Sequence, residues 1–67
     1  MSPKRIAQVL KKLRKEHGLS QRALAKRVRT TAGYIGILET GKKRNASPAV
    51  LERLAKALGV PVTELLG

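Results

Sequence analysis

The segment from residue 19 to residue 41, LSQRALAKRVRTTAGYIGILETG, limits the possible folds more than any other part of the chain. Ser20 and Thr31 each precede a short helical pattern, and both are good N-cap residues because a side-chain oxygen accepts a free first-turn amide. Gly41 follows the second pattern, where a left-handed backbone costs glycine little. The segment therefore predicts two short helices, over residues 20–28 and 31–40.

The apolar residues of this segment show how its two helices must pack. Leu24 and Val28 share one face of the first helix, and Ile35 and Leu38 share one face of the second. Helices this short, joined by three or four residues, must cross steeply and rest on other helices. The segment is therefore a helix-turn-helix unit.

The rest of the chain predicts three further helices. Ser2-Pro3 is an N-cap followed by a proline at the first helical position, and Ser47-Pro48 repeats this start. Amphipathic patterns follow both starts, a short apolar segment follows Gly59, and no strand pattern occurs. We therefore predict an all-α, five-helix single domain over residues 1–67, with helices at about 3–17, 20–28, 31–40, 48–58 and 62–66.

The residues at fixed offsets within this pattern resemble a known family. They are Gln21, Leu24, Ala25, Thr31, Tyr34, Ile35, Leu38, Glu39 and Gly41, followed by Leu58-Gly59-Val60 and Leu65. This set is similar to the phage repressor and Cro type (XRE-like) of helix-turn-helix domain over about residues 4–66. The resemblance implies a DNA-binding transcription regulator whose second motif helix, at about 31–40, enters the major groove.

Composition excludes most other kinds of chemistry. The 67 residues contain no cysteine, one histidine and four carboxylates, so a metal site or an acid–base pair has few possible members. We expect no cofactor, no metal and no enzymatic activity. His17 is more often a helix cap or a bystander than a ligand. No apolar run approaches a membrane span of about 18 residues, and no signal peptide opens the chain, which favours a cytoplasmic, nucleoid-associated protein.

The positive charge lies at one end of the sequence. Residues 1–44 contain thirteen Lys and Arg against two Glu, a net of +11, whereas residues 45–67 contain two of each. A solvated basic surface that only aids solubility is the alternative, but it fits an even distribution better. The asymmetry indicates a polyanionic partner that meets one face of the protein, and double-stranded DNA is the partner that the resemblance implies.

The resemblance places the base-contacting residues early in the helix at 31–40. They are Thr31, Ala32, Gly33 and Ile37, with Tyr34 and Gly36 beside them. The family often has side chains here that hydrogen-bond to base edges, and this sequence has few, so we expect readout by shape and by contact with thymine methyl groups. The two glycines have two open interpretations, which are close approach of the backbone to DNA and tolerated drift on a surface helix.

Other residues are expected to contact the DNA backbone. The resemblance assigns a phosphate contact to Gln21 at a helix N-terminus, and we expect the Tyr34 hydroxyl to reach a phosphate. Further expected contacts are Arg22, Thr40, Lys42, Lys43 and Arg44, and for each lysine a solvated side chain is the alternative.

Two residues have structural interpretations. The resemblance pairs Glu39 with Arg14 in an internal ion pair, because an acid facing DNA would repel phosphates. Arg29 stands where the family often has glycine, so either its backbone is left-handed or the turn differs.

Several function classes remain to be distinguished. We expect a weak homodimer through the C-terminal region, with Val60, Val62 and Leu66 either at the interface or in the core. The alternative function is an antitoxin or another protein-interaction module that shares this domain. Membrane-surface binding would need aromatic anchors, and single-strand RNA reading would need several stacking aromatics. The chain has one aromatic residue, Tyr34, which disfavours both functions.

Overall fold

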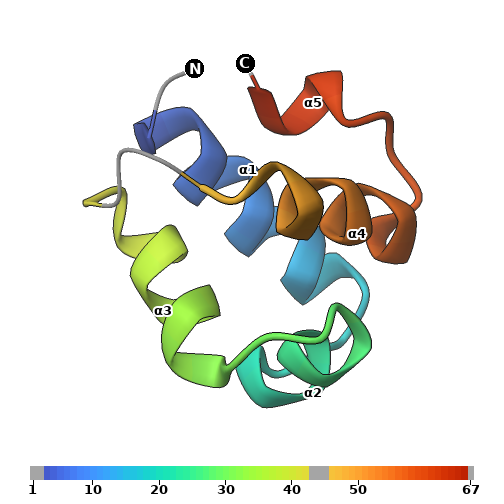
Figure 1. The fold of residues 1–67 in the computed structure, drawn as a ribbon. Helices are drawn as coiled ribbons and strands as arrows, with labels where there is room; N and C mark the ends of the chain where they lie inside the picture. The colour runs from blue at the N-terminus through green and yellow to red at the C-terminus, as the bar shows by residue number, and fades with distance from the viewer. Residues whose placement is uncertain (1–2, 43–45, 67) are drawn as a thin grey trace.

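Five helices make up the part of the chain that the computed structural model describes, residues 3–42 and 46–66 (Figure 1). This arrangement confirms the predicted all-α fold class, and no strand occurs in the described ranges. The expected N-cap Ser2 lies outside the described residues. The helices are α1 (Pro3–Glu16), α2 (Gln21–Arg27), α3 (Ala32–Thr40), α4 (Pro48–Leu58) and α5 (Thr63–Leu66).

The caps of α2 and α3 form at the residues that the sequence indicated. The Ser20 hydroxyl accepts the amide of Ala23 at 3.0 Å, and the Thr31 hydroxyl accepts the amide of Tyr34 at 3.1 Å. Gly41 ends α3 with a left-handed backbone at φ +76°. Each hydroxyl satisfies a first-turn amide that has no partner inside its own helix, which fixes where the helix starts.

One apolar core joins all five helices. Its fully buried side chains come from all five helices, because each helix turns one apolar stripe inward, and from Val28 directly after α2. Each such side chain contributes about 1.5–3 kcal/mol relative to an exposed position. The largest are Leu10, Leu24, Val28, Ile35, Leu54 and Leu65.

Helix α3 lies at one edge of the molecule. It packs against α1 and α2, while α4 and α5 lie on the other side of α1 in the view of Figure 1. The inner face of α3 carries Ile35 and Leu38, both buried in the core. Its outer face is covered by no other helix of the described structure. The fold therefore presents one helical surface for contact with a partner.

The turn between α2 and α3 is held by backbone and side-chain contacts. The Arg53 side chain on α4 donates from Nε to the Val28 carbonyl at 2.7 Å, and the Thr30 amide donates to the Ala25 carbonyl at 2.9 Å. Arg29 has a left-handed backbone at φ +58°, the only described non-glycine residue with positive φ. The structure thus selects the left-handed conformation of the two alternatives that the sequence left open at this position.

We expect Arg29→Gly to raise the melting temperature by about 3–6 °C. A left-handed non-glycine residue costs about 1–2 kcal/mol, and the greater freedom of glycine in the unfolded chain cancels part of the gain. Thermal unfolding followed by circular dichroism measures this shift. Arg29→Ala is the control, because it removes the same charge and keeps a Cβ. Equal melting temperatures for the two variants would contradict the interpretation.

The two C-terminal valines, expected either at a dimer interface or in the core, pack against the core. Val60 and Val62 are half-buried and pack against the core, and the side chain of Leu66 lies outside what the structure describes. His17, an expected cap or bystander, makes a hydrogen bond from Nε2 to the Leu58 carbonyl at 3.0 Å. It therefore ties the end of α1 to the last turn of α4. Pairing through the C-terminal region remains a prediction, since Val60 and Val62 also keep part of their surface accessible.

Candidate nucleic-acid interface

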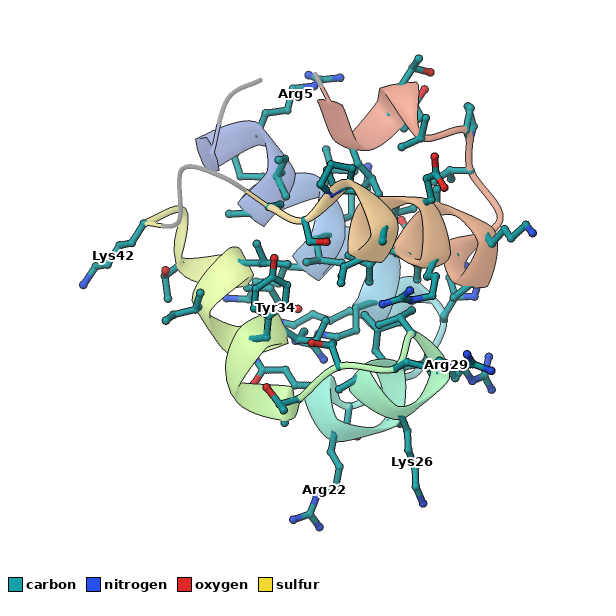
Figure 2. All side chains as sticks on the ribbon, in the orientation of Figure 1. Arg5, Arg22, Lys26, Arg29, Tyr34 and Lys42 are labelled. Atoms are coloured by element: carbon teal, nitrogen blue, oxygen red, sulfur yellow. The ribbon has the colours of Figure 1, made fainter. Side chains whose placement is uncertain are left out.

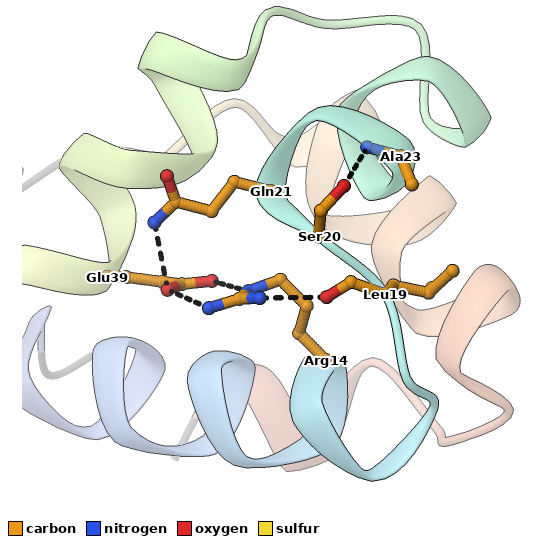
Figure 3. Close-up of polar contacts among 6 residues, drawn as sticks. All are labelled: Arg14, Leu19, Ser20, Gln21, Ala23 and Glu39. Atoms are coloured by element: carbon orange, nitrogen blue, oxygen red, sulfur yellow. Dashed lines mark hydrogen bonds and ion pairs between the residues drawn. The ribbon is translucent and has the colours of Figure 1, made fainter.

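A network of charged and polar side chains holds α3 against α1 and α2 (Figure 3). Arg14 donates to both oxygens of Glu39, with Nε to Oε2 at 2.6 Å and Nη2 to Oε1 at 3.0 Å. Arg14 Nη1 also donates to the Leu19 carbonyl at 2.8 Å, and Gln21 Nε2 donates to Glu39 Oε1 at 3.2 Å. The network therefore links the end of α1, the start of α2 and the end of α3.

The Arg14–Glu39 pair is largely shielded from solvent. The side chains are 11% and 4% exposed, respectively. The hydrogen bond to Glu39 raises the pKa of Arg14 above its ordinary value, the carboxylate charge adds to this, and burial opposes it. A raised pKa means that the stabilising contribution of Arg14 is fully present at neutral pH and is lost only in strongly alkaline solution. The pair thus fixes the position of α3 throughout the neutral range.

Gln21 takes part in this network, although the family resemblance assigned it a phosphate contact. Its amide group faces Glu39 and lies against Gly36, where an added Cβ would stand 3.4 Å from Gln21 Oε1. A Cβ at Gly36 would therefore make ordinary van der Waals contact with the Gln21 side chain. Gly36 faces the neighbouring helix. Neither close approach of the backbone to DNA nor drift on a surface helix therefore describes it.

The outer face of α3 carries a shallow, mostly apolar hollow of about 480 Å³. Five residues expected to meet DNA line it together, namely Thr31, Gly33, Tyr34, Ile37 and Lys42. Ile37 is 51% exposed and is the only large hydrophobic side chain so exposed among the described residues. Ala32 is half-buried and is not among the residues that line the hollow. The fold has thus gathered most of the predicted base-contacting residues on one surface.

Two hydroxyls expected at the DNA backbone have internal partners. The Tyr34 hydroxyl accepts the Ser47 amide at 2.9 Å, and the ring is half-buried against the core. The Thr40 hydroxyl donates to the Ile37 carbonyl at 2.6 Å and accepts the Lys42 amide at 3.2 Å. Thr40 therefore caps the end of α3, and Tyr34 connects α3 to the start of α4. The sequence indicated neither contact, because both partners are backbone groups.

We expect Tyr34→Phe to lower the free energy of unfolding by about 1–2 kcal/mol, because the Ser47 amide loses its acceptor. Denaturant unfolding measures this loss. DNA affinity of the folded variant provides a separate readout of the predicted phosphate contact. Unchanged affinity would argue against that contact, and unchanged stability would contradict the structural role.

Cationic side chains extend from α2 and from the end of α3. Arg22 and Lys26 extend from α2 into solvent, and Lys42 extends from the end of α3 (Figure 2). Lys26 was not among the predicted contacts, although its spacing of four residues from Arg22 places the two on one helix face. Lys43 and Arg44 lie outside the described residues. The described part of the surface is therefore suited to a polyanion.

No group of three or more potential metal ligands occurs among the described residues. A search of the same residues also finds no helix with the length and apolar character needed to cross a bilayer.

The family model described as helix-turn-helix matches residues 10–65, which include the whole α2–α3 unit. The chain belongs to this family. The resemblance to the phage repressor and Cro type is thereby confirmed. Comparison with curated protein sequences gives no match.

Solved structures of regulators share the fold over nearly the whole chain. The restriction-modification controller protein C.AhdI from Aeromonas hydrophila is 36% identical, with a TM-score of 0.84 and 94% of each chain covered. The master regulator for biofilm formation SinR, solved in complex with DNA, is 34% identical, with a TM-score of 0.86. That match covers 92% of this chain and 98% of SinR.

An enzyme also contains a domain of this shape. Hydroxypropylphosphonic acid epoxidase from S. wedmorenis is 25% identical, with a TM-score of 0.85. The match covers 97% of this chain and 34% of the epoxidase chain. The shared fold thus accounts for only about a third of that enzyme, and the helix-turn-helix family is the better guide to function.

Proposed function

We propose that this chain is a transcription regulator that binds double-stranded DNA with α3 in the major groove. The outer face of α3 carries the proposal, because it is covered by no other helix and is flanked by Arg22, Lys26 and Lys42. The major groove is about 12 Å wide and admits a helix. The similarity to SinR, which was solved with DNA, supports the same partner for this chain.

In this proposal the geometry of the motif depends on the internal ion pair. Arg14 and Glu39 hold the end of α3 against α1, and Gln21 ties it to α2. Glu39 is 4% exposed, so its negative charge is neutralised inside the protein and does not face the phosphates. The surface that meets DNA then contains cations and neutral side chains.

We further propose that two copies act together on a roughly palindromic site. Regulators of this shape place their recognition helices about 34 Å apart, one helical turn of DNA. Ile37 is the only exposed large hydrophobic side chain of the described residues, and it lies on α3, so the described C-terminal part offers little apolar surface for pairing. The dimer is therefore weak in free solution and forms on DNA. In this proposal the protein acts in the cytoplasm, at the nucleoid.

Fluorescence anisotropy with labelled duplex DNA at low salt tests the DNA-binding proposal. We expect tighter binding to the duplex than to a single strand of the same sequence, because only the duplex offers a major groove. Sedimentation of free and bound protein then gives the number of copies. Equal binding to the single strand would contradict the proposed role of α3, and one copy on every site would contradict the dimer.

A further inference from the structure

We propose that the hollow on α3 recognises the C5 methyl group of pyrimidines, with Ile37 and Gly33 as the residues that determine specificity. The proposal rests on the proposed function, since it requires α3 to lie in the major groove. The chemistry that is recognised is a 5-methylpyrimidine, and two bases supply it, thymine and 5-methylcytosine.

Ile37 provides the hydrocarbon surface. It is 51% exposed, whereas the other large hydrophobic side chains among the described residues are buried or half-buried. A single exposed apolar residue is ordinary on a protein surface. Ile37, however, lies in a mostly apolar hollow on α3, close in the sequence to Lys42, which lines the same hollow. In the major groove the thymine methyl is the apolar group that base pairs present to such a surface.

Apart from the Lys42 ammonium, which is expected at a phosphate, the hollow has few groups that can form hydrogen bonds with the bases. The hydroxyls of Thr31 and Tyr34 each accept one backbone amide, so each has at most one proton to donate to a base. Ala32, Gly33 and Ile37 have no polar side-chain atoms. Thymine differs from 5-methylcytosine in the group at C4, which an apolar hollow does not distinguish. We therefore expect the protein to recognise the methyl group and to ignore the rest of the pyrimidine edge.

Gly33 leaves open space in the hollow for this contact. A Cβ added at Gly33 would have one neighbour, Thr31 Oγ1 at 3.9 Å, so alanine fits the fold without a clash. Alanine also favours a helix more than glycine does. The fold therefore does not require glycine at this position, and the open space serves contact with a partner. Gly33→Ala fills that space while it keeps the helix.

Four alternating duplexes of about 30 base pairs test the proposal at about 50 mM salt, where backbone contacts give measurable binding without a known operator. The A/T and A/U duplexes form one pair, and the G/5-methyl-C and G/C duplexes form the other. The two members of each pair differ only in the methyl group. We expect about fourfold tighter binding to the methylated member of each pair, which corresponds to about 0.8 kcal/mol for one buried methyl-sized group.

Variants test whether the preference for methylated duplexes comes from the hollow. We expect Ile37→Ala and Gly33→Ala to bring both affinity ratios close to one and to leave the protein folded. Gly36→Ala is the matched control, because it makes the same change on the side of α3 that faces Gln21. It should keep the preference for methylated duplexes. Circular dichroism melting of each variant verifies that it is folded.

Each contrary outcome has a distinct meaning. Equal binding to the A/T and A/U duplexes overturns methyl recognition and leaves DNA binding in place. A preference for thymine over uracil without one for 5-methylcytosine over cytosine also overturns it, because the protein then distinguishes other groups on the base. Full preference in both Ile37→Ala and Gly33→Ala shows that the hollow is not the site. Failure to bind any duplex contradicts the proposed function itself.

Discussion

Replacing Glu39 with alanine is expected to lower the free energy of unfolding by about 3–5 kcal/mol. The Arg14 guanidinium, 11% exposed, then loses its carboxylate, and Gln21 Nε2 loses its acceptor. An uncompensated buried charge is costly because water cannot reach it fully. A domain of 67 residues has a total stability of about 3–10 kcal/mol, so this one substitution removes a large part of it.

Denaturant unfolding monitored by circular dichroism measures the loss, and a stabilising osmolyte allows the measurement if the variant is unfolded in buffer. Glu52→Ala is the control, because Glu52 is exposed and should change stability by less than about 0.5 kcal/mol. The double variant Arg14→Met, Glu39→Met should be more stable than Glu39→Ala, since it leaves no buried charge. A melting temperature of Glu39→Ala equal to that of the original protein would contradict the structural role of the pair.

Raising the salt concentration from about 50 to 200 mM is expected to weaken DNA binding several hundredfold. This size is for one copy with about five phosphate contacts, each of which contributes about −0.9 to the slope of log affinity against log salt. Arg22, Lys26 and Lys42 are the described cations that flank the outer face of α3. Lys43 and Arg44 follow them in the sequence and complete the expected set.

Single substitutions separate these contacts. We expect Arg22→Gln and Lys42→Gln each to reduce the steepness of the slope by about 0.9, with similar losses on all DNA sequences. Lys56→Gln is the control, because Lys56 lies in the last turn of α4, away from α3 (Figure 1). Anisotropy titrations at four or five salt concentrations provide the slopes. If Lys56→Gln changed the slope as much as Lys42→Gln does, DNA would be attracted by the overall charge of the protein and not by the proposed face.

The sequence predicted the helices and their caps well because these features depend on neighbouring residues. Ser20, Thr31 and Gly41 act within one turn of their own positions, so their residue types were sufficient. The pairing of Arg14 with Glu39 spans 25 residues, and only the family resemblance indicated it. The amphipathic patterns predicted which side chains are buried, since burial follows the helical period.

Contacts between distant side chains and backbone groups could not be predicted in this way. Tyr34 finds the Ser47 amide and Arg53 finds the Val28 carbonyl, and any buried polar backbone group is an equally good partner on sequence grounds. Gln21 has the right position for a phosphate contact, yet its side chain faces Glu39 because the steep crossing of α2 and α3 brings the two together. The crossing itself is a property of the packed helices.

Selection from a random duplex DNA pool at about 0.15 M salt tests the central claim most directly, because purely electrostatic binding is weak under these conditions. We expect enrichment of a two-fold symmetric site whose half-site centres are about 10 base pairs apart. Such a site would place two copies of α3 in successive major grooves on one side of the DNA. Binding seen only at low salt, with no enriched sequence, would contradict a sequence-reading role for α3.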